Sequence, residues 1–473
     1  MQDGPFEVLQ WNWKIQGLNL SDSKVIEPLI DYYKLPPDTV EYSAIPTDPR
    51  SDGIGFFKFG EPNICYGRSG IGVSLDPEGS VRFDAFPAAR QLGASLQLTF
   101  DFAEVVENLR RERYRQSNSR GNNPYAPGAF VYDVYYFLRR FLPFTVRRYL
   151  QRTYFRDWKK IPFPAWPVDF TVDRLHEEIL RLCMQISGLE EIPFIWFWPE
   201  GAPNCLIITH DVETAAGRDF AFELLKLDES YGFKGAYQVV PERRYEISEG
   251  YMSSIRDRGC EVNVHDLNHD GRLYKERSEF DRRALLINRY LHRYQSEGFR
   301  AGAMYRMQDW YEAFECKYDM SVPNVAHLEP MRGGCCTVMP YFIGEILEIP
   351  LTTAQDYSLF HILRDYTTEL WKRQIALIKE RSGLISFLTH PDYLVGQRER
   401  SVYESLLDYL KHMVAVEKTW ATLPGDVNHW WRARSRMQLV QREGVWQIEG
   451  PEKERARLAF ARLKDGHLAY QLA

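Results

Sequence analysis

Two carboxylates lie close together in the sequence where a strand is expected to end. Asp211 and Glu213 follow the apolar residues 205–208, with Val212 between them. In an extended segment, residues two apart point to the same side, so both carboxylates face one spot. One member of such a pair can bind a cation while the other remains free to take a proton. The pair therefore indicates metal-assisted acid–base chemistry.

Three histidines could complete such a site. His265 and His269 follow the expected strand 261–264, and a spacing of four on a helical turn places both imidazoles on one face, about 5 to 6 Å apart. Two histidines and one carboxylate can hold one metal ion and leave a position for water. His390 follows the last expected strand and would lie at the same rim.

Each motif also has a purely structural interpretation. Asp-Val-Glu is common at helix N-termini, His-x-x-x-His occurs on solvated helices, and a single histidine can be a satisfied core residue. All three motifs nevertheless follow an expected strand, and this shared placement favours a functional site.

Strands and helices are expected to alternate after residue 204. Helical periodicity separates the apolar runs, for example Phe280, Ala284, Ile287 and Leu291 on one expected helix face. Such alternation implies parallel strands, arranged in a closed or nearly closed barrel or in an open doubly wound sheet, with the site at their carboxyl ends. The seven expected strands are residues 205–209, 235–240, 261–264, 299–304, 320–322, 347–350 and 384–388.

The order of these motifs resembles a known family. Asp211-x-Glu213, His265-x-x-x-His269, Gly298-Phe299-Arg300-Ala301 and Leu388-x-His390 are similar to motifs of the polysaccharide deacetylases of carbohydrate esterase family 4, the NodB-homology domain. The resemblance covers residues 204–420. It implies an α/β fold, a distorted (β/α) barrel of about seven strands, together with a divalent metal, often zinc, and hydrolysis of an acetamido group on a sugar.

The resemblance also implies roles for individual residues. Asp211 would be the general base, Arg300 would orient it, His390 would be the general acid, and Asp319 lies near the expected position of an aspartate partner for that acid. The implied metal ligands are Glu213, His265 and His269.

The sequence departs from the family pattern in several places. Val212 separates the two acids, as in a variant subset that includes enzymes of small amides and cyclic imides. Gly302 stands where the family usually has proline, and the family's tryptophan motif is not evident. The substrate class is therefore left open by the first motif.

The flanking regions lack a catalytic signature. A length of 473 residues predicts two or three units: an N-terminal α+β extension of unknown role over 1–195, the deacetylase-like barrel over 196–423, and a small β appendage over 424–473. Glu443-Gly444 and Asp465-Gly466 are typical of hairpin turns within that appendage.

Residues 139–160 combine many basic residues with aromatic ones. An amphipathic helix with a solvated basic face is the favoured interpretation. The alternative is a platform for an anionic glycan or a lipid-linked phosphate, which predicts that Arg148 and Arg152 contribute to substrate affinity.

Composition excludes several classes of partner. A formal net charge of −6 gives no reason to expect nucleic-acid binding, and seven scattered cysteines without a C-x-x-C pair indicate reduced, buried thiols. The first residues lack the pattern of a signal peptide, and no apolar stretch is long enough for a membrane span. We therefore expect a cytoplasmic protein with a carbohydrate substrate; the oligomeric state is left open.

The expected activity is metal-dependent removal of N-acetyl groups from amino sugars of a poly- or oligosaccharide or its precursor. The alternatives are a metal-dependent amidohydrolase or imidase of a small molecule, and a catalytically silent glycan-binding protein.

Overall fold

The central unit is a curled sheet of parallel strands. The computed structural model describes residues 27–36, 42–44, 53–92, 95–116 and 144–473. Six of the seven expected strands are present, and the strand expected at 320–322 lies two residues earlier, at 318–319. All seven strands are parallel, in the order β13-β11-β10-β9-β8-β7-β14, which confirms the α/β barrel-like fold. They are β7 (Cys205–Val212), β8 (Ala236–Val239), β9 (Glu261–His265), β10 (Gly298–Arg300), β11 (Tyr318–Asp319), β13 (Ile346–Glu348) and β14 (Leu384–Thr389).

Two further strands, not expected from the sequence, join this sheet. β12 (Tyr341–Ile343) runs antiparallel to β13, and β15 (Trp420–Thr422) pairs with the first half of β7.

Side-chain hydrogen bonds connect β14 to the segment after β13, two parts of the barrel that no backbone pairing joins. Ser386 of β14 and Thr352, four residues after β13, exchange hydrogen bonds: each backbone N–H donates to the other's hydroxyl, at 3.0 and 2.9 Å. The Ser386 hydroxyl also donates to the carbonyl of Pro350 at 2.6 Å. The sheet is therefore a distorted, nearly closed barrel.

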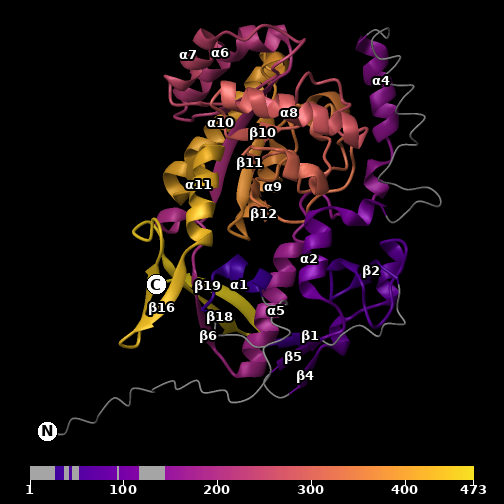
Figure 1. Cartoon of the computed structure of the whole chain (residues 1–473), viewed down its shortest axis with the longest axis vertical. Coiled ribbons are helices and arrows are strands. Elements are labelled where there is room, and N and C mark those ends of the chain that lie inside the picture. Colours follow the sequence, from indigo (N-terminus) through magenta and orange to yellow (C-terminus); the bar gives the residue numbers. More distant parts are fainter. Residues whose placement is uncertain (1–26, 37–41, 45–52, 93–94, 117–143) are drawn as a thin grey trace, which may run out of the picture.

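Helices cover the outside of the barrel (Figure 1). Each buries an apolar stripe; in α8, for example, Phe280, Ala284, Ile287 and Leu291 are buried, as their spacing predicts. Thr214 caps α6 by accepting a hydrogen bond from the Gly217 N–H at 3.0 Å. The barrel helices are α6 (Ala215–Ser230), α7 (Glu249–Arg256), α8 (Arg277–Arg293), α9 (Glu369–Lys379) and α10 (Gln397–Glu417).

The N-terminal extension is α+β, as expected, and most of it lies below the barrel in Figure 1. Helix α4 is the exception, because it stands beside the barrel. The extension contains α1 (Glu27–Tyr33), β1 (Tyr42–Ala44), β2 (Gly55–Lys58), β3 (Ile64–Gly67), β4 (Arg90–Leu92), β5 (Ser95–Leu98), α2 (Phe102–Arg110), α4 (Phe144–Phe155), α5 (Thr171–Ser187) and β6 (Glu191–Ile195). Residues 139–143 of the basic stretch lie outside the described residues.

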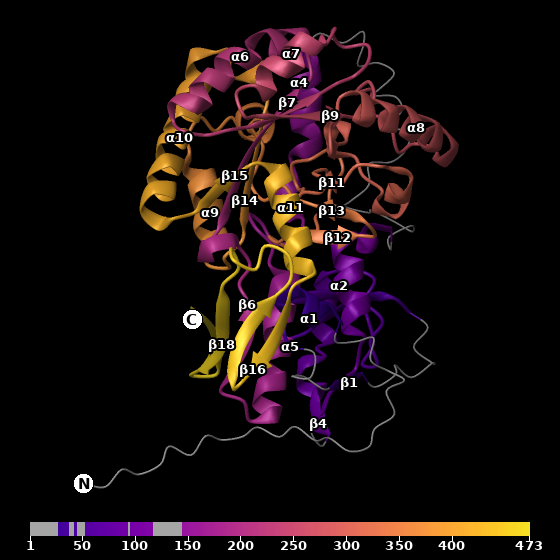
Figure 2. The ribbon, with the colours of Figure 1, turned by 60° about the vertical axis from the view of Figure 1, so that its left-hand side comes forward.

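The C-terminal segment forms two hairpins after a helix (Figure 2). Both hairpin turns are confirmed, since β16 pairs with β17 and β18 with β19. β18 also pairs with β6, so one small sheet joins the two flanks of the barrel, and the division at residues 195 and 423 stays a prediction. The elements are α11 (Pro424–Ser435), β16 (Gln438–Arg442), β17 (Val445–Glu449), β18 (Leu458–Lys464) and β19 (His467–Leu472).

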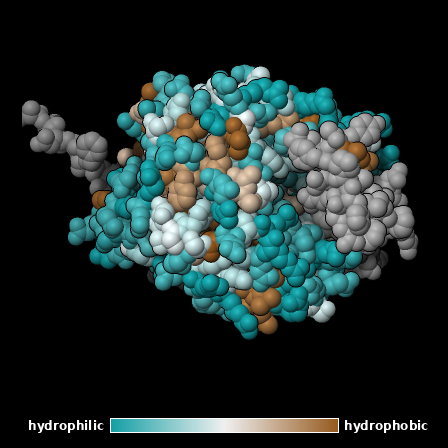
Figure 3. All heavy atoms as spheres, turned by 90° about the horizontal axis from the view of Figure 1, so that it is seen from above, coloured by the Kyte–Doolittle hydropathy of each residue, from teal (hydrophilic) through white to brown (hydrophobic). Residues whose placement is uncertain are grey.

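The surface is mostly polar and the cysteines are reduced, as the composition predicts. The face in Figure 3 is largely hydrophilic with separate hydrophobic patches, and all seven cysteines are buried free thiols. None of the described helices combines the length and apolar character that crossing a membrane requires.

Candidate active site

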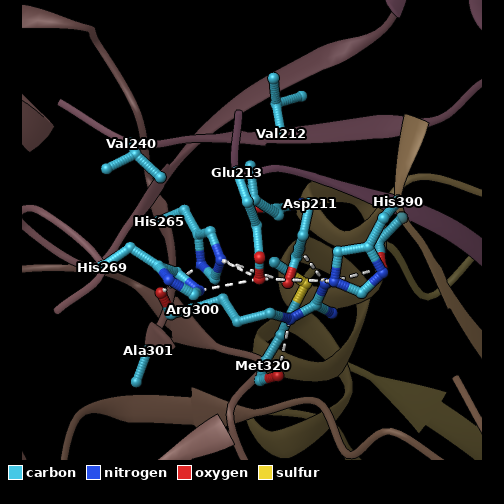
Figure 4. Close-up of polar contacts among 12 residues, drawn as sticks. Asp211, Val212, Glu213, Val240, His265, His269, Arg300, Ala301, Met320 and His390 are labelled. Atoms are coloured by element: carbon cyan, nitrogen blue, oxygen red, sulfur yellow. Dashed lines mark hydrogen bonds and ion pairs between the residues drawn. The ribbon is translucent and has the colours of Figure 1, made fainter. Parts of the chain in front are cut away.

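The two acids lie at the end of β7 and face the barrel interior (Figure 4). Asp211 is 2% exposed, and its Oδ1 accepts a hydrogen bond from Arg300 Nη1 at 2.8 Å. His210, the residue before it, has a structural role, because its ring nitrogens contact Thr389 Oγ1 and Asp228 Oδ2, both at 2.8 Å. The strand alternation thus separates the acids from the neighbouring histidine.

The two paired histidines approach Glu213 from β9 and the loop after it. Their ring centroids are 4.8 Å apart, yet they do not lie on a helical turn, and that expectation is wrong. The backbone N–H of Asp266 donates to the carbonyl of Arg300 at 2.8 Å, which continues the strand pairing. Asp266 and His269 then adopt left-handed conformations, with φ of 55° and 52°. These two turns, rather than a helix, bring His269 back towards His265.

The atoms of this triad are placed as metal ligands require. Nε2 of His269 lies 2.8 Å and Nε2 of His265 lies 3.6 Å from Glu213 Oε1. Both Nε2 atoms are buried, and neither forms a hydrogen bond of good geometry with a described residue. One carboxylate oxygen and two imidazole nitrogens, all within 4.8 Å of one another, form a donor set that suits zinc and leaves a position for water.

The opposite ring nitrogens of the two histidines hold the rings in place. His265 Nδ1 lies 3.0 Å from the carbonyl of Arg300, so it donates there and leaves Nε2 with its lone pair. His269 Nδ1 lies 3.2 Å from Arg244 Nη2, and that guanidinium also donates to the carbonyl of His269. Both imidazoles are therefore oriented by contacts outside the triad.

The glycine that replaces the family's proline packs directly against the triad. A Cβ on Gly302 would lie 2.6 Å from Asp266 Oδ2 and 2.9 Å from Cδ2 of His269. Such distances force a shift of the histidine loop.

Gly302→Ala is therefore expected to weaken zinc binding by about tenfold, the effect of disturbing the support of a metal ligand. Titration of metal-free protein with zinc and a competing chelator measures it. Gly250→Ala is the matched control, since the nearest atom to its Cβ, Ser248 Oγ, is 3.9 Å away. Equal zinc affinity in both variants would contradict the packing argument.

Arg300 holds Asp211 in place, as expected. It also donates from Nη1 to Thr209 Oγ1 at 2.9 Å and from Nε to the carbonyl of Met320 at 3.0 Å. Burial raises the pKa of Asp211, but Arg300 and then His265 outweigh it and lower the pKa below its ordinary value. Asp211 is therefore ionised at neutral pH.

His390 faces the same point from β14. Its Nε2 lies 3.4 Å from Glu213 Oε1, and one oxygen or nitrogen of each of Asp211, Glu213 and His390 lies within 4.8 Å of the others. Asp356 holds the imidazole: its Oδ1 is 2.7 Å from His390 Nδ1, and its Oδ2 accepts from the His390 backbone N–H at 2.7 Å. Burial lowers the pKa of His390, but Asp356 and Glu213 raise it well above its ordinary value.

The aspartate partner of His390 is thus Asp356, and the expectation for Asp319 is wrong. The carboxylate of Asp319 accepts from Tyr311 Oη at 2.9 Å and from the Ser321 backbone N–H at 2.8 Å, and it lies beside the buried Glu348. Asp319 follows Tyr318 on β11, and consecutive residues of a strand point to opposite faces. Tyr318 donates to Asn263 Oδ1 at 3.1 Å. Asn263 lies on the same face of β9 as His265, because residues two apart on a strand share a face. Asp319 therefore points away from the face that carries the site.

Sequence reasoning missed Asp356 because it follows no expected strand. It lies eight residues beyond β13 and caps η9 (Tyr357–Leu363), where its side chain accepts a hydrogen bond from the Tyr357 N–H. An aspartate before an apolar helical segment is an N-cap signal. That signal alone does not indicate contact with a histidine 34 residues later.

Comparisons with known proteins give a likeness over about half of the chain. No protein-family model matches the sequence, and no curated protein is significantly similar to it. Similar solved structures include a probable polysaccharide deacetylase from Pseudomonas aeruginosa PAO1, with 14% identity over 50% of this chain and 93% of that one and a TM-score of 0.41.

Two other similar structures have related descriptions. Puue allantoinase is 13% identical over 50% of this chain and 92% of its own, with a TM-score of 0.40. A family 4 acetyl xylan esterase from Clostridium thermocellum, in complex with a cobalt ion, is 12% identical over 48% of this chain and 91% of its own, with a TM-score of 0.33. Polysaccharide deacetylases and carbohydrate esterases of family 4, which the motifs resemble, are thus among the similar solved structures.

Proposed function

We propose that the chain is a metal-dependent hydrolase that removes N-acetyl groups from amino sugars of a poly- or oligosaccharide or its precursor. The observation that carries this proposal is the convergence of three potential ligands, Glu213, His265 and His269, between Asp211 and His390. Amide hydrolysis needs this combination of groups, because water must lose a proton and the amine must gain one.

The base side of the site is formed by Asp211. A divalent ion held by Glu213, His265 and His269 would supply Lewis-acid polarisation of the carbonyl and would lower the pKa of a water molecule towards about 7. Arg300 occupies Asp211 Oδ1, and Oδ2 lies 3.5 Å from His265 Nε2, on the side of the triad. Oδ2 is therefore the oxygen that takes the proton of the attacking water.

The acid side is formed by His390. Asp356 accepts from Nδ1, so the proton on Nε2 points to the site beside Glu213. When the C–N bond breaks, the water oxygen remains with the acetate and the amine nitrogen takes this proton. Because an unprotonated amine is a poor leaving group, the placement of His390 favours amide hydrolysis.

A second candidate is hydrolysis of a small amide or cyclic imide by the same groups. The Asp-x-Glu spacing of the first motif favours this alternative. The chemistry at the C–N bond is the same, so only the substrate distinguishes the two.

The test is release of acetate from N-acetylated chito-oligosaccharides and from simple acetamides, with and without a chelator. We expect release from the sugars that stops when the metal is removed and returns with zinc. Release from small amides or ring opening of cyclic imides alone would favour the second candidate. Absence of any turnover by zinc-loaded protein would indicate a catalytically silent glycan-binding protein.

A further inference from the structure

A side-chain hydrogen bond joins the two chain segments that carry Glu213 and His390. The hydroxyl of Thr214 donates to Asp392 Oδ2 at 3.2 Å. Thr214 directly follows Glu213, and Asp392 lies two residues after His390. The bond therefore links a proposed metal ligand to the proposed acid through two short stretches of backbone.

The backbone pairing of the barrel ends before these side chains are reached. β7 pairs with β14 as far as His210 and with β8 as far as Val212. Glu213 thus follows the last paired residue of β7 on both of its sides. On β14 the last residue in this pairing is Thr389, directly before His390. The spacing of Glu213 and His390 therefore depends on contacts beyond the strand ladder.

Thr214 and Asp392 are each held by helix α6. Thr214 Oγ1 accepts a hydrogen bond from the Gly217 N–H at 3.0 Å while it donates to Asp392, so the two bonds polarise each other. A Cβ on Gly217 would lie 3.5 Å from Asp392 Oδ1 and 3.6 Å from the Asp392 backbone nitrogen. The short helix η10 (Pro391–Tyr393) thus packs against the first turn of α6, where the helix dipole favours a carboxylate.

The position of Glu213 matters because one of its oxygens faces both a histidine ligand and the acid. Its Oε1 lies 2.8 Å from His269 Nε2 and 3.4 Å from His390 Nε2 (Figure 4). Groups of a working site have to be held within about 0.5 Å of the productive geometry by the residues around them. A contact that fixes both segments therefore bears on metal binding and on the placement of the acid.

We propose that Thr214 and Asp392 are positioning residues, which fix Glu213 relative to His390 and thereby raise the affinity of the site for its metal. This inference rests on the proposed function for the role of Glu213 as a ligand. Both residues act through their neighbours in the chain rather than on the substrate. Support of this kind typically contributes about 10-fold to 100-fold in metal affinity.

The affinity of the metal-free protein for zinc, measured by titration against a competing chelator, tests the proposal without requiring turnover. Thr214→Val keeps the branched shape but lacks the hydroxyl, and Asp392→Leu lacks the carboxylate. Each should weaken zinc binding by about tenfold or more. Thr214→Ser keeps the hydroxyl and should bind zinc as the unmodified chain does. The double variant should bind no more weakly than the weaker single variant, because both changes break the same bond.

A second helix cap provides the control for lost stability. Thr214→Val also removes the cap of α6, which lowers the stability of the fold whatever happens at the site. Ser248 caps α7 by accepting a hydrogen bond from the Tyr251 N–H at 3.1 Å. Ser248→Ala should therefore lower the urea midpoint in a similar way but leave zinc affinity unchanged.

Unchanged zinc affinity in Thr214→Val and Asp392→Leu would overturn the inference and leave the proposed function standing. Losses that multiply in the double variant would also overturn it, since the two side chains would then act independently. A loss in Ser248→Ala as large as that in Thr214→Val would reduce the effect to general destabilisation and overturn it as well. Absence of zinc binding by the unmodified chain would contradict the proposed function together with this inference.

Discussion

Replacing Asp211 with asparagine is expected to lower kcat by about a hundredfold or more while one metal ion stays bound. Asparagine has nearly the same shape, but it cannot take a proton from water, and general base catalysis typically contributes about 10² to 10⁴ in rate. The carboxylate contacts Arg300 through Oδ1 and is not one of the three ligands proposed for the metal. Steady-state kinetics with zinc-loaded protein, together with metal analysis, measure both quantities.

Two further variants distinguish loss of the base from loss of the metal and from a nonspecific effect of the substitution. His265→Ala should lose metal and activity together, because its Nε2 is a proposed ligand. Asp257→Asn, an exposed aspartate at the end of α7, should change neither. If Asp211→Asn loses metal as completely as His265→Ala, the division between base and ligand is wrong.

Removal of Glu112 is expected to destabilise the whole protein by about 3 to 5 kcal/mol. Glu112 lies in the N-terminal extension and is 3% exposed, and Arg306 in the barrel is 1% exposed. Arg306 Nε donates to Glu112 Oε2 at 2.6 Å, and the Gly334 N–H donates to Glu112 Oε1 at 2.6 Å. Without the carboxylate, the buried guanidinium would lose its ion-pair partner among the described residues, so Glu112→Ala should lower the denaturation midpoint strongly.

A surface ion pair of the same extension provides the control. Glu107 pairs with Arg111 on α2, and its side chain is 40% exposed. Glu107→Ala should cost about 1 kcal/mol or less, as exposed pairs do. Urea denaturation of both variants compares the two free energies of unfolding. Similar values would mean that the buried pair does not join the extension to the barrel.

The parallel strands could be predicted from the sequence because each carries its own signal. Residues 205–209 and 384–388, for example, are apolar runs bounded by polar residues. This pattern is typical of parallel strands that are buried on both faces. The carboxyl ends of neighbouring parallel strands meet at one edge, so Asp211, His265 and His390 had to converge once the strands were placed.

Contacts that depend on irregular backbone could not be predicted. His269 reaches the triad through two left-handed residues, and sequence periodicity does not reveal such turns. Asp356 meets His390 because a π-helix follows a loop, and Arg306 meets Glu112 across 194 residues. Each of these contacts is set by tertiary packing rather than by a local pattern.

The metal content of purified protein after zinc loading and dialysis tests the central claim most directly. Elemental analysis should find one zinc ion per unmodified chain. Glu213→Gln, His265→Ala and His269→Ala should each retain far less, because each lacks one of the three converging donor atoms. Acetate release should follow zinc content across the series. One zinc ion retained in all three variants, or none in the unmodified chain, would contradict the account.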